Sequence, residues 1–214
     1  MMQVISHRGY WKTAAEKNTA TAFARSFEMG FGTETDVRDL NGLLVISHDM
    51  PQHPTMTLRQ YLADLGSFTD PGRLTQAINI KSDGLATDLA VQMKRCTHPW
   101  FVFDMSVPDM IQHIRAGNPT LARMSEYEDF PAKLQHQIKG IWLDAFTSTW
   151  YSVDVIETLL KQGLQVCIVS PELHGRTDYE ALWHALRSVS AYDNLILCTD
   201  LPEAARSVLD LPSL

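Results

Sequence analysis

Two histidines and an arginine lie directly after short apolar runs near the start of the chain. His7 and Arg8 follow the run at 4–6, and His48 follows the run at 43–46. A histidine titrates near neutral pH and can act as a general base or acid, whereas an arginine can bind a phosphate through two parallel hydrogen bonds. This combination favours a displacement at a phosphate ester, which requires proton transfer and cations around the phosphate.

A set of oxygen-bearing side chains accompanies these residues. Glu34 and Asp36 are two residues apart in an extended segment, so both side chains are expected on one face of a strand. Asn79 and Lys81 share a face of the predicted strand 76–81 for the same reason. Carboxylate and amide oxygens suit Mg²⁺ or Ca²⁺ better than zinc. We therefore expect Glu34, Asp36 and Asn79 to bind a divalent cation, with Lys81 adding a positive charge beside the phosphate.

Three further side chains, Ser106, Asp144 and Trp11, are weaker candidates for substrate contact. Ser106 and Asp144 lie just after apolar runs, but capping of a following helix explains each of them at least as well. Trp11, with Tyr10 before it, either lines a sugar or glycerol pocket or packs on the rim of the fold.

Charge and hydropathy limit the possible partners of the protein. The 214 residues carry a formal net charge of −7, which argues against a nucleic-acid partner because phosphate backbones select basic surfaces. The first residues show no basic and apolar signal-peptide pattern, and no apolar run approaches the length of a membrane span. We expect a cytoplasmic protein that acts on a small molecule. The oligomeric state stays open.

The cysteines and remaining histidines point away from disulfides and zinc. Cys96, Cys167 and Cys198 are odd in number and far apart, and the last two lie within apolar runs, so we interpret them as buried thiols. The eight histidines show no spacing typical of a zinc site.

Strand-like and helix-like segments alternate along the whole chain. The strand candidates are 4–6, 32–37 with a continuation after the Asn-Gly pair at 41–42, 76–81, 100–103, 120–124, 140–143, 164–169 and 195–198. The helix candidates are 19–29, 57–65, 86–95, 108–114, 153–161, 179–189 and a short helix opened by Pro202.

Eight strands separated mostly by helices predict an α/β protein with a single (β/α)8 barrel spanning residues 1–214. The chemistry-bearing residues all follow strands, and active sites of such barrels lie at that end. The alternative is an open doubly wound sheet, but the glycine-rich phosphate loop expected of that fold does not occur.

Several motifs occur in an order that resembles a known family. They are His-Arg-Gly at 7–9, Asn-Thr-Ala-Thr-Ala-Phe at 18–23, Glu-Thr-Asp-Val at 34–37, His-Asp at 48–49 and Thr-Asp-Leu-Pro at 199–202. The order is similar to that of the glycerophosphodiester phosphodiesterases, within the superfamily that includes phosphatidylinositol-specific phospholipase C. The family pattern reads H-R-G, E-N-T-x-x-A-F, E-x-D-V, H-D and T-D-x-P.

The resemblance implies a role for each matching residue. His7 and His48 would perform acid–base catalysis, Arg8 would hold the phosphate, and Glu34 and Asp36 would ligate the metal. It also implies attack by a neighbouring substrate hydroxyl, which gives a cyclic phosphate that water then opens. Glu172 and His174 stand where relatives place polar residues on the substrate side.

The sequence departs from the family pattern at three places. Asn79 replaces the glutamate of the family motif E-x-K, so the cation should bind less tightly. Lys17 replaces the glutamate before Asn-Thr, although Glu16 lies one residue earlier. The segment after the His-Asp pair is short and lacks the usual family insertion, which leaves the alcohol of the substrate unspecified.

The expected function is metal-dependent hydrolysis of a glycerophosphodiester-like or polyol phosphodiester, including headgroup-type esters. Two alternatives stay open: a noncatalytic barrel that binds phosphate esters, and a lyase or transferase that stops at the cyclic phosphate.

Overall fold

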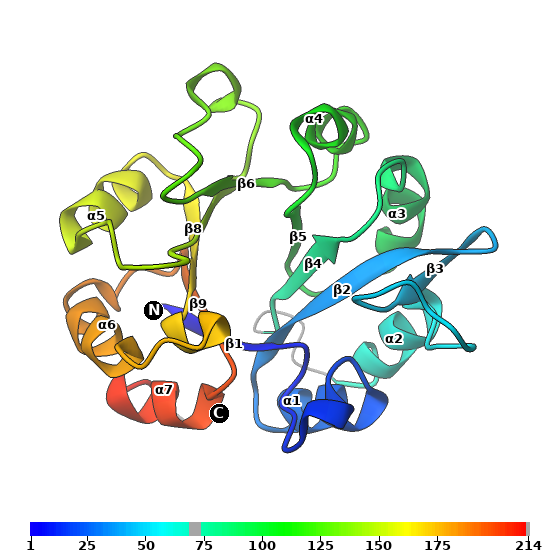
Figure 1. The fold of residues 1–214 in the computed structure, drawn as a ribbon, viewed down its shortest axis with the longest axis horizontal. Helices are drawn as coiled ribbons and strands as arrows, with labels where there is room; N and C mark the ends of the chain where they lie inside the picture. The colour runs from blue at the N-terminus through cyan, green and yellow to red at the C-terminus, as the bar shows by residue number, and fades with distance from the viewer. Residues whose placement is uncertain (69–73, 213–214) are drawn as a thin grey trace.

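Eight parallel strands form a barrel wall within residues 1–68 and 74–212, the part of the chain that the computed structural model describes (Figure 1). They are β1 (Gln3–His7), β2 (Gly32–Leu40), β4 (Gln76–Ile80), β5 (Trp100–Phe103), β6 (Leu121–Met124), β7 (Gly140–Leu143), β8 (Gln165–Val169) and β9 (Leu195–Thr199). The predicted (β/α)8 barrel is confirmed.

The barrel is closed by a weak seam. The hydrogen-bonded strand order runs β5-β4-β2-β1-β9-β8-β7-β6, so β5 and β6 are its two ends. A single parallel bridge between Val102 and Thr120 joins them, and the Val102 amide donates to the Pro119 carbonyl over 2.8 Å.

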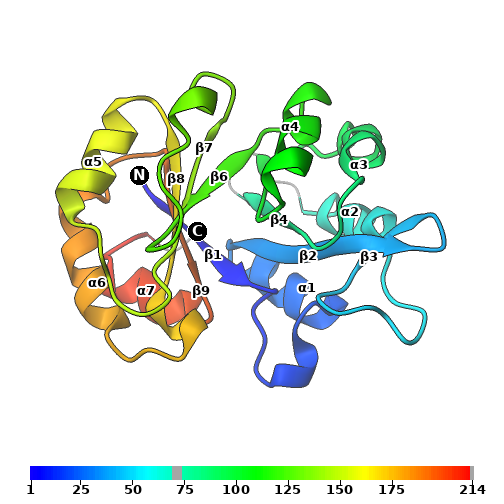
Figure 2. The same cartoon turned by 45° about the horizontal axis from the view of Figure 1, so that its top comes forward.

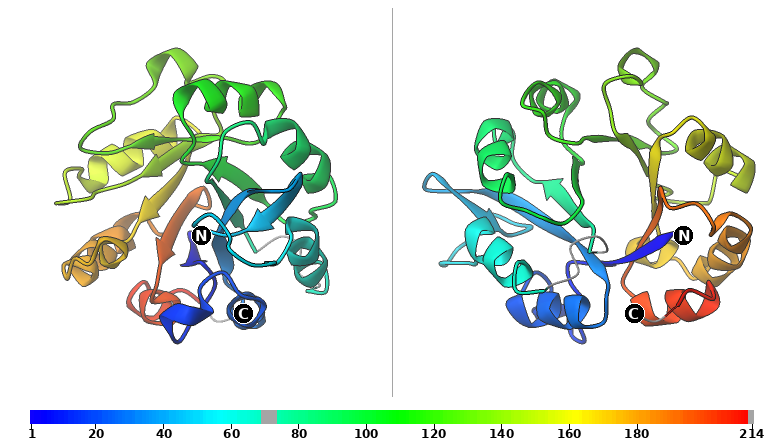
Figure 3. Two further views of the ribbon diagram at one scale, coloured as in Figure 1. Left: turned by 45° about the vertical axis from the view of Figure 1, so that its right-hand side comes forward. Right: turned by 180° about the vertical axis from the view of Figure 1, so that it is seen from behind.

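Helices cover the outside of the strands (Figure 2). They are α1 (Ala20–Glu28), α2 (Leu58–Leu65), α3 (Ala86–Met93), α4 (Val107–Arg115), α5 (Val153–Lys161), α6 (Tyr179–Leu186) and α7 (Pro202–Val208). Short 3₁₀ turns lie at η1 (Ala14–Glu16), η2 (Ala132–Leu134), η3 (Pro171–His174) and η4 (Arg187–Val189). Figure 3 shows the first and last helices, α1 and α7, side by side. Among the described residues, no helix has the length and apolar character needed to cross a membrane.

The second strand continues after Asn41-Gly42 as expected, and this pair forms a hairpin turn. The run after Asn41-Gly42 forms β3 (Leu43–Ile46), which returns antiparallel to β2 with Val37 opposite Ile46. The turn residues have φ values of 51° and 78°, which the Asn-Gly pair tolerates. Because the hairpin runs out and back, β3 ends beside the top of the barrel, where the Ser47 amide donates to the Asp36 carbonyl over 3.0 Å.

Apolar side chains from alternate strand positions fill the barrel interior. This cluster includes Ile5, Phe101, Phe103, Trp142, Cys167, Val169 and Cys198. The rings of Phe103 and Trp142 stack with centroids 3.7 Å apart, which closes the interior just below the carboxyl ends of the strands. Cys167 and Cys198 are free and buried, as predicted, and burial raises the pKa of both thiols.

Candidate active site

The turn after β1 is built from two consecutive left-handed residues. Arg8 has a φ of 59° and Gly9 a φ of 79°. A Cβ at Gly9 would lie 2.8 Å from the Ala22 Cβ on α1, so only glycine fits. The Arg8 amide donates to both the carbonyl oxygen and the Oε2 atom of Glu34, over 3.0 and 3.1 Å. The turn therefore ties the His-Arg-Gly motif directly to the first carboxylate of β2.

His7 is held by Asp200, which follows β9. The His7 Nδ1 and Asp200 Oδ1 atoms are 2.8 Å apart, and the Trp11 indole donates to the same oxygen over 3.1 Å. Burial alone raises the pKa of Asp200, but hydrogen bonding and charge from His7 outweigh it and the pKa lies below its usual value. A carboxylate only accepts, so His7 donates from Nδ1 and its Nε2, 3.9 Å from Glu34 Oε2, is the nitrogen left for proton transfer.

Glu172 lies behind this pair. Its carboxylate accepts from the hydroxyls of Ser170 and Thr199 and from the Asp200 amide, the last over 3.1 Å. It does not line the cavity described below. In this structure Glu172 supports the loop that carries Asp200.

The two carboxylates of β2 differ in their surroundings. Asp36 is fully buried and has cations on both oxygens, with Arg8 Nε 2.9 Å from Oδ2 and Lys81 Nζ 3.3 Å from Oδ1. The Asn18 amide also donates to Asp36 Oδ2, over 2.8 Å. Glu34 has less compensation, and burial, followed by the charge of Asp36, raises its pKa to about 7. Asp36 thus holds Arg8 and Lys81 in place, while the Oε1 atom of Glu34 has no hydrogen-bond partner among the described residues.

The donor set fits a hard divalent cation. Glu34 Oε1, Asp36 Oδ1 and Asn79 Oδ1 are buried and, among the described residues, have no hydrogen-bond partner. Asp36 and Asn79 are paired across β2 and β4, which places the three residues on adjacent strands. No cluster of three or more His, Cys, Asp or Glu residues suited to a metal occurs within 1–68 and 74–212. The three residues offer two carboxylates and an amide, oxygen donors of the kind that Mg²⁺ and Ca²⁺ take.

A cavity of about 280 Å³ opens above the carboxyl ends of the strands. One wall carries the predicted phosphate and metal residues, His7, Arg8, Glu34 and Asn79, together with Lys17. The opposite wall carries Asp104, Arg123, Asp144, Phe146, Leu173 and His174, and the Phe103 and Trp142 rings form part of the lining.

The opposite wall is anchored by ion pairs. Asp144 is buried, and its Oδ1 lies 2.6 Å from His174 Nε2. The Arg123 guanidinium donates to Asp104 and Glu128, and Lys81 Nζ lies 3.5 Å from Asp104 Oδ2. Asp104 thereby links the two walls.

Lys17, noted in the sequence only as a departure, lies at the cavity. Its amine is 4.4 Å from the centre of a Trp11 ring and 4.0 Å from Asp200 Oδ2. Trp11 itself does not line the cavity, and its indole instead supports Asp200.

Four other predicted residues do not line the cavity. Two of them, Asp36 and Lys81, contact its lining through ion pairs with Arg8 and Asp104. The His48 side chain is 44% exposed and its Nδ1 lies 2.8 Å from Asp49 Oδ1 on the rim. Ser106 caps α4 by accepting from the Asp109 amide, over 3.4 Å, and donates to Asp83. The geometry of Ser106 is that of the helix cap that the sequence also allowed.

Four site residues were given no role from the sequence: Asp104, Asp200, Arg123 and Phe146. Asp200 lies two residues after the predicted strand 195–198, so the rule that placed His7 at a strand end applied to it as well. Arg123 falls within a predicted strand, where periodicity alone did not separate an inward from an outward side chain.

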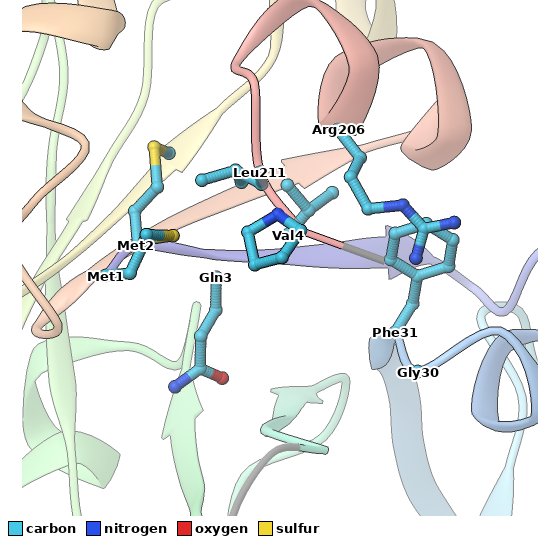
Figure 4. A pocket seen from close by; sticks show the side chains of 9 residues that line it. Met1, Met2, Gln3, Val4, Gly30, Phe31, Arg206 and Leu211 are labelled. Atoms are coloured by element: carbon cyan, nitrogen blue, oxygen red, sulfur yellow. The ribbon is translucent and has the colours of Figure 1, made fainter. Parts of the chain in front are cut away.

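A second cavity, of about 390 Å³, lies around the start of β1 (Figure 4). Its lining is mainly apolar, and the guanidinium of Arg206 lies 4.3 Å from the centre of the Phe31 ring. Arg206 also donates to the Met29 carbonyl over 2.9 Å, so the contacts of this cation are structural. The acid–base groups are gathered at the other cavity.

The fold and this site define a parallel barrel with an acid–base and cation cluster at the carboxyl end of its strands. The sequence matches no protein-family model and no curated protein. A glycerophosphodiester phosphodiesterase from Parabacteroides distasonis has a similar structure, with a TM-score of 0.69 at 21% identity, over 98% of this chain and 97% of that one.

Two further solved structures share the architecture. A second Parabacteroides distasonis protein, a glycerophosphoryl diester phosphodiesterase, gives a TM-score of 0.54 at 11% identity, over 99% of this chain and 88% of that one. A Ca²⁺-dependent phosphatidylinositol-specific phospholipase C from Streptomyces antibioticus gives 0.62 at 12% identity, over 97% and 95%. The chain therefore has the fold shared by these phosphodiesterases.

Proposed function

We propose that this protein is a phosphodiesterase that cleaves a glycerophosphodiester-like or polyol phosphodiester. The main observation behind the proposal is one cavity lined by Arg8, Glu34, Asn79 and His7, with His7 held by Asp200 and buried oxygens of Glu34 and Asn79 free of hydrogen bonds among the described residues. The similarity of the fold to known phosphodiesterases supports it.

Each of these groups has a task in the reaction. His7, whose Nε2 is left free by the bond to Asp200, removes the proton from the attacking hydroxyl of the substrate. Arg8 and Lys81 compensate the phosphate charge, and Asp36 fixes both cations in place. A neighbouring hydroxyl of a glycerol or polyol is the nucleophile, which yields a cyclic phosphate for water to open.

The cation would be held by Glu34, Asp36 and Asn79. Once bound there, Mg²⁺ or Ca²⁺ would neutralise charge on the phosphate oxygens. The cavity lining itself carries three cations, Arg8, Lys17 and Arg123, and three carboxylates, Glu34, Asp104 and Asp144.

A noncatalytic phosphate-ester-binding barrel is the second candidate. Asn79 and Lys17 favour it, because a neutral amide and an extra cation suit anion binding without a tightly held metal. The His7–Asp200 pair favours catalysis, since binding alone does not require an oriented imidazole.

Turnover of a phosphodiester panel separates the candidates. We expect cleavage of glycerophosphodiesters with Mg²⁺, Ca²⁺ or Mn²⁺ and its loss with excess chelator. Zero turnover across the panel, together with measurable phosphate-ester binding, would establish the binding protein instead. If Glu34→Gln stays active in excess chelator, the metal assignment is wrong.

A further inference from the structure

The cavity contains a second imidazole that is paired with a carboxylate. His174 Nε2 lies 2.6 Å from Asp144 Oδ1, and the same oxygen accepts from the Ala145 amide over 2.8 Å. Asp144 follows β7 and His174 ends η3, the turn after β8, so two neighbouring strand ends create the pair. Since the carboxylate accepts from Nε2, the Nδ1 atom remains for a ligand, and no group within the described ranges bonds it.

The surroundings of His174 hold its ring in place. The centre of the Phe146 ring lies 4.8 Å from that of His174. The backbone amides of Phe146, Thr147 and Ser148 donate to the Glu126 carboxylate over 2.8 to 3.2 Å. Desolvation alone would raise the pKa of Glu126, but these hydrogen bonds lower it to about 2. The loop that carries Phe146 is therefore fixed to the segment after β6.

His174 lies on the wall opposite the phosphate and metal residues. In an in-line displacement the attacking and departing oxygens lie on opposite sides of phosphorus, so the departing alcohol needs a proton donor other than His7 in the same cavity. His174 and Phe146 line that wall, whereas His48 does not line the cavity at all. Two paired imidazoles, His7 at the end of β1 and His174 after β8, thus line one small cavity from strands that are separated only by β9.

We propose that His174, held by Asp144, is the catalytic residue that protonates the departing alcohol. The inference rests on the phosphodiesterase function proposed above. The substrate hydroxyl forms the new P–O bond and gives its proton to His7 Nε2. The P–O bond to the alcohol breaks, its electron pair stays on the alcohol oxygen, and that oxygen takes the proton from Nδ1 of the His174 imidazolium. Neutral His174 keeps its Nε2–H bond to Asp144.

Leaving-group dependence tests this assignment. The two substrates are glycerophosphate diesters of ethanol and of p-nitrophenol, whose anion departs without a proton. We expect His174→Ala to lower kcat about 10²-fold or more on the ethyl ester, and less than about 10-fold on the p-nitrophenyl ester. Asp144→Asn should show the same selectivity to a smaller degree. His184→Ala, an exposed histidine on α6, is the matched control and should change neither rate.

Other results of these kinetic measurements would overturn the assignment of His174. Equal losses on both substrates, or a rise in KM with kcat unchanged, would overturn the assignment and leave a structural or binding role. The same selective loss in His48→Ala but not in His174→Ala would identify His48 as the proton donor. Circular dichroism of each variant separates misfolding from chemistry, and His174→Gln replaces His174→Ala if the latter unfolds. If the wild-type protein cleaves neither ester, it is the phosphodiesterase proposal itself that fails.

Discussion

His7 and Asp200 show how one hydrogen bond sets the reactivity of a residue. The bond to Asp200 fixes the ring of His7 and leaves Nε2 as the unprotonated nitrogen. Trp11 and Glu172 hold Asp200 from two other directions. Asp200 therefore positions His7 and takes no part in the proton transfer itself.

Removing the imidazole should abolish most of the turnover. We expect His7→Ala to lower kcat about 10²-fold or more, with an unchanged circular dichroism spectrum. Asp200→Asn should lower kcat by a smaller factor with little change in KM, because the ring remains but its orientation is lost. Asp193→Asn, an exposed aspartate before β9, is the control. Wild-type kinetics in His7→Ala would rule out its catalytic role.

Asn79 sets the charge of the cation site. Asn79→Asp adds a negative charge beside Glu34 and Asp36, and oxygen sites gain affinity for divalent cations with ligand charge. Calorimetric titration with Mg²⁺ or Ca²⁺ should therefore show tighter binding. Asn41→Asp adds the same charge at the exposed β2–β3 turn and should leave affinity unchanged. Identical affinities for wild type and Asn79→Asp would remove Asn79 from the ligand set.

Among the helices and strands, those that carry the site residues were predictable from the sequence, but the placement of some of their side chains was not. The Glu34–Asp36 spacing and the His-Arg-Gly turn are local features: the two carboxylates lie within β2, and the turn lies at the carboxyl end of β1. Asp144 and His174 are 30 residues apart in sequence and meet only because β7 and β8 pair. His48 bonds Asp49 and does not line the cavity, a placement that periodicity does not encode.

The close approach of β7 and β8 requires glycine at the start of β7. A Cβ at Gly140 would lie 1.9 Å from the Gln165 carbonyl oxygen, so Gly140→Ala must push the strands apart. We expect a loss of about 1–3 kcal/mol in the free energy of unfolding, measured by urea denaturation. Gly66→Ala is the matched control, since its φ of −65° suits alanine and the nearest atom is 3.2 Å away. Equal midpoints for both variants would contradict the close approach.

At the scale of the whole molecule, the barrel has a strong side and a weak one. β1, β8 and β9 are paired on both edges along several residues, whereas β5 and β6 meet through the single Val102–Thr120 bridge. The eight strands and their helices were predictable because the spacing of apolar residues within each segment indicates a strand or a helix. The place of the seam was not, since it depends on how far two strands overlap after the ring has closed.

Amide hydrogen exchange should reveal this seam. Local opening requires fewest broken contacts where backbone pairing is sparse. Peptides covering β5 and β6 should exchange before peptides covering β8 and β9, as followed by mass spectrometry. Equal protection of all four strands would show that the barrel opens only as a unit.

Phosphorus NMR of a glycerophosphodiester incubated with the protein and Mg²⁺ or Ca²⁺ follows the proposed cleavage itself. We predict that the diester signal falls, that a cyclic phosphate appears and then opens to a monoester, and that chelator or His7→Ala suppresses the first step. A cyclic ester that accumulates and never opens would make the protein a lyase. A diester signal that stays unchanged with every cation and substrate, while the ester binds, would contradict the proposed phosphodiesterase.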